Sequence, residues 1–311
     1  MQIIYQSEIK TLSPCVATVG FFDGLHAGHR FLIEELKGIA KEQHIQSVVV
    51  TFAIHPRKVL NSEFKPELLT TLSEKLTQLA TTGIDTCIVL DFSLQMAKLS
   101  AYDFLKTILK EQFNVQTLLV GHDHRFGHNR ADGFPEYKKY GEALGMTVLK
   151  CTQYHTDTDK HISSSEIRNA LKTGEIELAN RLLTYQYSVQ GKVIEGFKNG
   201  RLIGFPTANI DLFDPEKIIP AIGVYAVRVT WNGSLYKGML NIGHRPTLDN
   251  GLNISIEVHI LDFDTDIYNQ TLEVSFIVKI RNEKKYNSIE ALKDQLQKDK
   301  LFVLNLEMDE L

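Results

Sequence analysis

The sequence predicts an α/β protein with two domains: a parallel sheet flanked by helices, followed by a small antiparallel β-barrel with a terminal helix. Up to about residue 183, short apolar runs alternate with amphipathic segments of helical period, which is typical of a parallel sheet covered by helices. From about residue 186, apolar and polar residues alternate at period two, which is typical of half-buried antiparallel strands. The 311 residues are also enough to build two separate cores.

In the N-terminal half, five apolar runs predict buried strands and four amphipathic stretches predict helices. The runs are residues 15–19, 47–52, 86–90, 117–120 and 147–149, and the helical stretches lie near 29–43, 73–82, 100–112 and 134–144. Ser100 followed by Asp103 predicts a capped helix start. Because ligands of such sheets bind at the carboxyl ends of the strands, we expect functional residues in the loops that follow them.

In the C-terminal half, Asn232-Gly233 predicts a tight hairpin between a strand that ends at Trp231 and a return strand over 234–242. Alternation over 254–260 and 274–280 predicts two more strands, and several such strands favour a barrel. A final helix is predicted near 288–299, capped by Asn287 with Glu290 as its partner. The change in period places the boundary near Thr184, giving domains 1–184 and 185–311.

Composition restricts the function classes. A net charge of -4 gives no overall attraction to nucleic acid or to an anionic membrane, so any phosphate recognition has to be local. Cys15, Cys87 and Cys151 are widely spaced without a CxxC pair, which favours reduced thiols in the cytoplasm and no zinc site. No apolar run approaches a membrane span and the start carries no signal-peptide pattern. The oligomeric state stays open.

The most informative segment runs from Val19 to His29, with the sequence V-G-F-F-D-G-L-H-A-G-H. Its glycines allow a tight turn and a close approach to a ligand. His26 and His29 lie three residues apart, so they share a face of the first helical turn. A strand, a glycine turn and a helix start make an anion site, where two imidazoles can bind phosphate. The segment resembles the H-x-G-H element of nucleotidylyltransferases.

Three further segments are expected at the same sheet edge. Thr51-Phe-Ala-Ile-His-Pro-Arg57 follows the second strand, and Leu119 to Gly133 follows the fourth with glycine at regular intervals. In Ile162-Ser-Ser-Ser-Glu-Ile-Arg168, a capping box and a phosphate site are both consistent with the residues, since they use the same free N–H groups. Taken alone, His55 and Arg57 are equally consistent with a surface loop, whereas the regular glycines between Leu119 and Gly133 make a plain solvated loop the weaker interpretation.

Together these segments resemble the FMN adenylyltransferase domain of prokaryotic bifunctional riboflavin kinase/FAD synthetases. The family patterns are G-x-F-D-G-x-H-x-G-H, T-F-x-P-H-P, V-G-x-D-F-x-F-G and S-S-T-x-I-R, and the first is intact from Gly20 to His29. Three positions depart from the patterns: Ile54 replaces proline, His124 replaces an aromatic residue and Ser165 replaces threonine. The resemblance implies a Rossmann-like nucleotidylyltransferase fold.

The resemblance also implies which residues bind the substrates of adenylyl transfer. ATP would be bound by Gly20, Phe21, Asp23, His26, Gly28, His29, Gly121, Asp123, Ser164, Ser165 and Arg168. The flavin would be bound by Phe52, His55, Pro56, Arg57, Phe126 and Arg130. Of these residues, four would stabilise the triphosphate and the departing pyrophosphate: His26, His29, Ser164 and Arg168.

A second string lies between Gly191 and Asn209. Its glycines bracket a turn that can fold over phosphates, and the Thr207 hydroxyl and Asn209 carbonyl are hard oxygen ligands suited to Mg²⁺. From the residues alone, a plain hairpin loop is the simpler interpretation. However, G-R-x-x-G-F-P-T-A-N is the mark of riboflavin kinases, and the segments 223–227, 241–247, 257–263 and 280–286 resemble the same family in order.

This second resemblance implies a kinase site. ATP would be bound by Gly196, Gly200, Arg201, Gly204, Phe205, Pro206, Thr207 and Asn209, with Thr207 and Asn209 serving Mg²⁺. Glu257 would be the base that accepts the 5′-hydroxyl proton of riboflavin; it alternates with apolar Ile256 and Val258, so it points away from their core.

The two resemblances imply a bifunctional enzyme of FAD biosynthesis with small-molecule substrates. It would phosphorylate riboflavin with ATP to give FMN, and then adenylylate FMN with a second ATP to give FAD and pyrophosphate. Two alternatives remain at this point. One is an adenylyl- or cytidylyltransferase for another phosphate acceptor, and the other is a non-enzymatic flavin-binding regulator.

Overall fold

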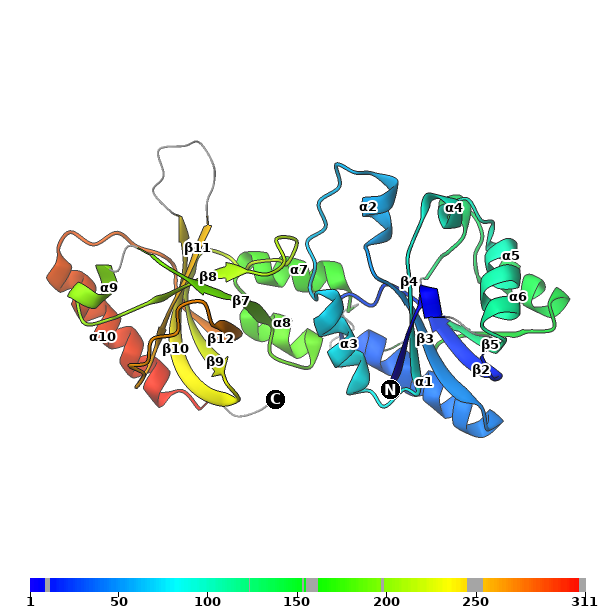
Figure 1. The fold of residues 1–311 in the computed structure, drawn as a ribbon, viewed down its shortest axis with the longest axis horizontal. Helices are drawn as coiled ribbons and strands as arrows, with labels where there is room; N and C mark the ends of the chain where they lie inside the picture. The colour runs from blue at the N-terminus through cyan, green and yellow to red at the C-terminus, as the bar shows by residue number, and fades with distance from the viewer. Residues whose placement is uncertain are drawn as a thin grey trace. The chain divides into compact units, whose positions relative to one another are not determined.

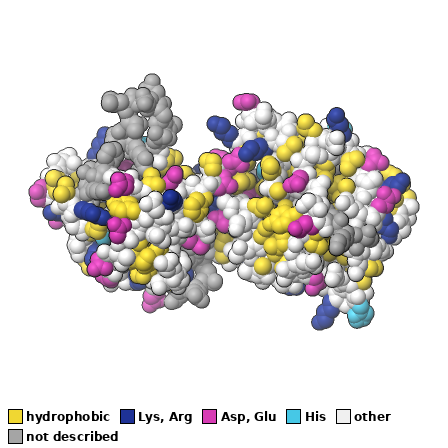
Figure 2. All heavy atoms as spheres, viewed as in Figure 1, with side chains coloured by type: hydrophobic (Ala, Val, Ile, Leu, Met, Phe, Trp, Pro, Cys, Tyr) yellow, Lys and Arg dark blue, Asp and Glu magenta, His cyan; other side chains and the backbone are white. Residues whose placement is uncertain are grey.

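The computed structural model describes residues 1–8, 12–122, 124–152, 154, 162–196, 199–244 and 254–307. The chain divides into two compact units, Met1–Ser163 and Ser164–Leu311. Figure 2 shows acidic and basic side chains interspersed over the visible face of each unit, in keeping with the small net charge. Among the described residues, none of the helices combines the length and apolar character needed to cross a membrane.

The first unit is built on a six-stranded, wholly parallel sheet in the order β1-β4-β3-β2-β5-β6. The strands are β1 (Gln2–Tyr5), β2 (Cys15–Val19), β3 (Gln46–Phe52), β4 (Thr86–Leu90), β5 (Val115–Val120) and β6 (Thr147–Lys150). The predicted parallel sheet is therefore confirmed, and β1 is an added edge strand that the apolar runs did not indicate. The strand order reverses between β2 and β5, which is the point where such sheets bind ligands.

Helices cover both faces of this sheet (Figure 1). They are α1 (Ala27–Gln43), α2 (Pro56–Leu60), α3 (Leu72–Ala80), α4 (Leu94–Ala97), α5 (Ala101–Asp103) and α6 (Phe134–Ala143), with short 3₁₀ turns η1 (Gln6–Glu8) and η3 (His128–Arg130) and a π-helical segment η2 (Phe104–Gln112). Side chains of β2 alternate between two cores. Val16 packs with α1 and α3, whereas Ala17 packs with η2 and α6. Ser100 caps α5 by accepting from the Asp103 N–H, as predicted.

The second unit is a closed antiparallel barrel with strand order β10-β11-β8-β7-β12-β9. Its elements are α7 (Ser164–Thr173), α8 (Ile176–Leu183), β7 (Ser188–Ile194), α9 (Asn199–Leu202), β8 (Ala208–Leu212), β9 (Gly223–Trp231), β10 (Ser234–His244), β11 (Ile254–Ile260), β12 (Thr271–Arg281) and α10 (Ile289–Asn305). The predicted barrel and hairpin are confirmed; Asn232 and Gly233 both have positive φ, as the tight turn requires. The terminal helix is capped by Ser288 rather than Asn287 and runs beyond residue 299.

Helices α7 and α8 pack with the barrel. The Asn180 side chain donates to the Phe276 carbonyl at 2.9 Å and accepts from the Tyr187 N–H at 2.8 Å. The Ala221 N–H donates to the Leu171 carbonyl at 2.9 Å. The compact units therefore divide before α7, whereas the change in sequence period lies after α8.

Candidate functional site

The turn after β2 carries the two predicted phosphate-binding histidines. His26 occupies the position before the first turn of α1, with extended backbone angles, and His29 follows in that turn. Their rings stack with centroids 3.7 Å apart and 18° between planes, and the Phe22 ring meets His29 edge-on. Gly24 has a φ of 78°, a conformation that glycine adopts without strain. The structure therefore places the two imidazoles together at a helix N-terminus.

His29 is held in its neutral form. The pKa of His29 lies well below its ordinary value, chiefly because burial removes the hydration of the charged form. Electrostatic repulsion from His26, His124 and Lys75 lowers this pKa further. Within the described residues, its buried Nδ1 makes no hydrogen bond. A neutral imidazole has one donor and one acceptor, so His29 can donate a hydrogen bond to a phosphate oxygen without carrying charge.

The loop after β5 reaches the same edge of the sheet, because β2 and β5 are neighbours at the reversal of strand order. Gly121 begins this loop; a Cβ there would stand 3.6 Å from the His124 Cβ and 3.8 Å from Leu32 of α1. Phe126 stacks on Tyr137, with ring centroids 4.1 Å apart. Asp123 and the Arg130 side chain lie outside the described residues, so their roles stay predictions.

The loop after β3 contributes a small aromatic cluster. His55 caps α2 by accepting from the Arg57 N–H at Nδ1, with Pro56 at the first helical position. Its ring meets Phe21 edge-on at 4.7 Å and lies 5.4 Å from Phe64. Ile54, the departure from the family pattern, is half exposed. The predicted flavin segment therefore touches the predicted triphosphate segment through His55 and Phe21.

Asp23 has a different environment from its neighbours in the turn. The carboxylate is buried and accepts from the N–H groups of Leu69 and Thr70 at 3.0 Å, and from the Thr70 hydroxyl at 3.3 Å. These bonds fasten the turn to the segment before α3. The bond from the Gly24 N–H to the Thr70 hydroxyl, at 3.1 Å, strengthens the same junction.

Ser164, Ser165 and Arg168 lie in the first turns of α7 and so belong to the second unit. Their predicted contact with a triphosphate stays a prediction. Within the first unit, the chain just before them passes the histidine turn: the Ile162 carbonyl would lie 4.0 Å from a Cβ built on Gly28.

The second unit brings together the three residues predicted for kinase chemistry. Thr207 directly precedes β8, Asn209 lies in β8, and Glu257 lies opposite Asn209 in β11. The Thr207 hydroxyl donates to Glu257 Oε2 at 3.3 Å. The site thus combines a hydroxyl, an amide carbonyl and a carboxylate, which are the oxygen donors that Mg²⁺ prefers. Among the described residues, no cluster of three His, Cys, Asp or Glu side chains could hold a metal.

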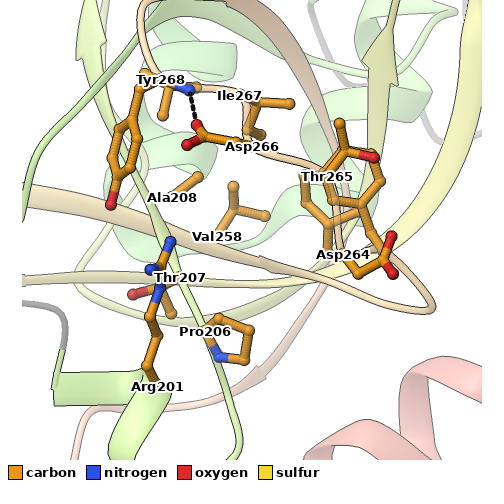
Figure 3. Close-up of a pocket in the computed structure, with 13 residues that line it drawn as sticks. Arg201, Pro206, Thr207, Ala208, Val258, Asp264, Thr265, Asp266, Ile267 and Tyr268 are labelled. Carbon is orange, nitrogen blue, oxygen red and sulfur yellow. Dashed lines mark hydrogen bonds between the residues drawn. The ribbon is translucent and has the colours of Figure 1, made fainter.

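A cavity of about 410 Å³ adjoins this group (Figure 3). Arg201, Pro206 and Thr207 line one part of it, and the segment from Phe263 to Tyr268 lines another. Val258 and Ile267 give it an apolar surface, while Asp264 and Asp266 supply carboxylates. Asp266 accepts from the Tyr268 N–H at 3.0 Å, so that loop is held in its own turn. Apolar walls with a few polar groups are typical of small-molecule sites.

The predicted glycines let the backbone approach these residues. A Cβ on Gly196 would collide with the Asn209 side-chain amide, and one on Gly200 would collide with the Phe205 carbonyl. Gly204 has a φ of 85°, in the region that favours glycine. The three glycines of the predicted phosphate turn are therefore needed for its conformation.

Two residues that lie next to the predicted sites were not singled out from the sequence. His259, two residues after Glu257 on β11, holds the Pro206 carbonyl through Nδ1 at 2.7 Å and packs edge-on against Phe205. Lys75 of α3 is buried beside the first site. The signal for Lys75 was present, because it shares the spacing of the apolar residues Leu72, Leu76 and Leu79.

Two family models match the chain, one over each group of site residues. A model described as FAD synthetase matches residues 8–166, and a model described as riboflavin kinase matches residues 183–306. The chain belongs to the bifunctional riboflavin kinase/FMN adenylyltransferase family. It is 38% identical over 285 residues to a member from Listeria monocytogenes, with 91% of this chain and 90% of that one covered. A Bacillus subtilis member is 38% identical over 297 residues, covering 92% and 90%.

A solved structure extends the similarity to the whole fold. It matches this chain with a TM-score of 0.90 and 31% identity, and covers 99% of this chain and 100% of its own. Its title describes a macrolide-efflux protein from Streptococcus pneumoniae, whereas the curated family members carry the name of the two flavin activities.

Proposed function

We propose that the chain makes FAD from riboflavin in two steps, one in each unit. The observation that carries this proposal is the correspondence between the family matches and the two site geometries. The FAD synthetase match covers the stacked His26 and His29 at the reversal of strand order. The riboflavin kinase match covers the Thr207–Glu257 contact beside the cavity.

In the kinase step, the 5′-hydroxyl oxygen of riboflavin attacks the γ-phosphorus of ATP, and the bond from that phosphorus to the β-phosphate oxygen breaks. Glu257 accepts the hydroxyl proton, and its contact with Thr207 keeps the carboxylate beside the phosphate turn. Thr207 and Asn209 would hold Mg²⁺, which supplies charge neutralisation on the phosphates. The Pro206 carbonyl, held by His259, fixes the backbone immediately before Thr207.

In the adenylyl step, a phosphate oxygen of FMN attacks the α-phosphorus of a second ATP. The bond to the bridging oxygen of the β-phosphate breaks, and pyrophosphate leaves. The chain supplies no nucleophile, so its contribution is positioning and stabilisation of charge. His26 and His29 donate hydrogen bonds to the phosphates at the start of α1, and the family resemblance implies that Arg168 adds a positive charge.

The substrates and the cysteines also support a location. ATP is used in both steps, and the three cysteines are free and buried in separate positions. Unpaired thiols of this kind are typical of a reducing compartment, which favours the cytoplasm.

The test is a time course with riboflavin, ATP and Mg²⁺, with the flavins separated by chromatography. We expect FMN to appear first and FAD to follow, with one pyrophosphate released for each FAD. Supplying FMN directly should give FAD without a lag, and pantetheine phosphate in place of FMN should give no adenylylated product. Binding of flavin without any turnover of ATP would contradict the proposal and favour a regulator.

A further inference from the structure

A buried lysine lies between the two loops of the first unit that are assigned to the two substrates. Lys75 is 2% exposed and lies on the face of α3 that packs against the sheet, beside Leu76 and Leu79. Lysine is almost never fully buried unless its ammonium group is paired. The groups that pair with it therefore indicate what the residue is for.

Lys75 Nζ donates to two backbone carbonyl oxygens, that of Phe21 at 3.1 Å and that of Phe52 at 2.9 Å. The same nitrogen lies 4.1 Å from the centroid of the Phe21 ring, close enough for a cation–π contact. The Phe21 carbonyl also accepts from the Thr51 hydroxyl at 3.1 Å. One side chain thus donates to two carbonyls, and that of Phe21 has a second donor in Thr51.

The two carbonyls belong to different loops. Phe21 follows β2 and lies in the turn that leads to His26, and Phe52 is the last residue of β3 and leads to His55. Phe21 also meets His55 edge-on. Lys75 therefore links the predicted triphosphate loop to the predicted flavin loop at the carboxyl edge of the sheet.

The charge of Lys75 is sensitive to its surroundings. Burial is the largest cause that lowers the pKa of Lys75 to about 8, while Asp23 and Cys87 act in the opposite direction. Cys87 of β4 keeps its proton near pH 8 because burial raises its pKa to about 12. His29 of α1 is neutral there, since its pKa is well below 6.5. Lys75 is therefore the group among these that changes charge near pH 8.

We propose that Lys75 is a positioning residue for adenylyl transfer: through the carbonyls of Phe21 and Phe52 it fixes the spacing between bound ATP and bound FMN. The inference rests on the proposed function of the first unit. Transfer requires the FMN phosphate oxygen to lie in line with the α-phosphorus, and a displacement of about 1 Å can cost on the order of 10²-fold in rate. Lys75 touches neither substrate and acts through the two loops.

The test compares full-length wild type with Lys75→Met and Lys75→Arg, all assayed for FMN-to-FAD and riboflavin-to-FMN conversion. For Lys75→Met we expect kcat/KM for FAD formation to fall about 10²-fold, with a higher KM for both FMN and ATP. Riboflavin phosphorylation should stay within about 2-fold of wild type. Lys37→Met is the matched control, because Lys37 also donates to one backbone carbonyl, that of Thr82, but away from both loops.

The dependence of kcat/KM for FMN on pH distinguishes a positioning role of Lys75 from a merely structural one. Lys75 is charged below about pH 8 and neutral above it. The neutral amine donates weaker hydrogen bonds to the two carbonyls and loses the cation–π contact with Phe21, so wild-type kcat/KM for FMN should fall as pH rises through about 8. In Lys75→Arg this fall should move to higher pH, since guanidinium keeps its charge. In Lys75→Met the fall should be absent. The wild-type profile decides the matter even where Lys75→Met is unstable.

Two results would overturn this inference and leave the proposed function standing. One is FAD formation by Lys75→Met at the wild-type rate, and the other is a wild-type pH profile of kcat/KM that is flat from pH 7 to 9.5. Equal losses in Lys75→Met and Lys37→Met would overturn it as well, since both would then reflect general destabilisation. A wild-type chain that makes no FAD from FMN would overturn the proposed function together with this inference.

Discussion

The geometry of the histidine pair at the start of α1 predicts how much the rate of FAD formation falls when His29 is removed. His29 stacks on His26 and offers a neutral donor at a helix N-terminus. Loss of one donor that stabilises developing charge costs on the order of 10²–10³ in rate. We therefore expect His29→Ala to lower kcat for FAD formation by this factor. Riboflavin phosphorylation in the same purified protein serves as the control, and equal losses of both activities would instead indicate misfolding.

Glu257 is the residue on which the kinase proposal depends most directly. Glutamine at this position keeps the size and an oxygen that accepts from Thr207, but it is not a base near neutral pH. Because general-base catalysis is worth about 10²–10⁴, we expect Glu257→Gln to lose that much kcat for FMN formation while FMN is still converted to FAD. Steady-state assays of the folded variant measure both.

A matched substitution exists on the same barrel. Glu273 lies on β12 and accepts from the Gln190 side chain at 3.1 Å, well separated in sequence from the kinase segment. Glu273→Gln should keep the rate of FMN formation within about 2-fold of wild type. A Glu257→Gln rate as high as that of Glu273→Gln would remove Glu257 from the mechanism.

At the scale of elements, the segment just after β7 requires a glycine at position 196. A Cβ on Gly196 would occupy the place of the Asn209 amide, so Gly196→Ala must displace a predicted Mg²⁺ ligand or the turn itself. We expect this variant to raise the KM for ATP in the kinase step and to lower kcat/KM about 10²-fold, with FAD formation from FMN unchanged.

Gly38→Ala provides the comparison for that variant. Gly38 lies within α1, and a Cβ there would meet nothing within 4 Å. Alanine should therefore stabilise the helix by about 1 kcal/mol without altering either activity. Normal ATP affinity in Gly196→Ala would show that β8 tolerates the extra carbon.

At the scale of the whole molecule, the division into units makes a prediction about fragments. Helices α7 and α8 bury Ile167, Leu171 and Leu183 within the second unit, and each buried side chain of this kind is worth about 1.5–3 kcal/mol. A fragment of residues 164–311 should therefore unfold at a higher denaturant concentration than one of residues 186–311. Trp231, the single tryptophan of the chain, lies in the barrel and reports on this transition by fluorescence.

Both fragments are also assayed for activity. The longer fragment should form FMN from riboflavin and ATP but no FAD. FAD formation by it would contradict the assignment of adenylyl transfer to the first unit, and equal midpoints for the two fragments would show that α7 and α8 add nothing to the barrel.

The sequence by itself determined the chemistry-bearing segments and the class of each half. Apolar runs, the change from helical to alternating period and Asn232-Gly233 are local patterns, and local patterns are fixed by side-chain chemistry and turn geometry. The spacing of His26 and His29 likewise predicted that both rings lie together at the start of a helix. The same holds for the P-T-A-N string, which puts Thr207 and Asn209 beside each other.

Only the tertiary structure decided which distant segments meet, because strand order and register depend on packing over the whole unit. It placed the β5 loop beside the histidine turn and set Glu257 opposite Asn209. It also assigned α7 and α8 to the second unit, within which their apolar faces pack. Their sequence period alone groups them with the helices of the N-terminal half. Lys75 illustrates the physical reason: its charge is tolerated in a core only because two loop carbonyls, far away in sequence, converge on it.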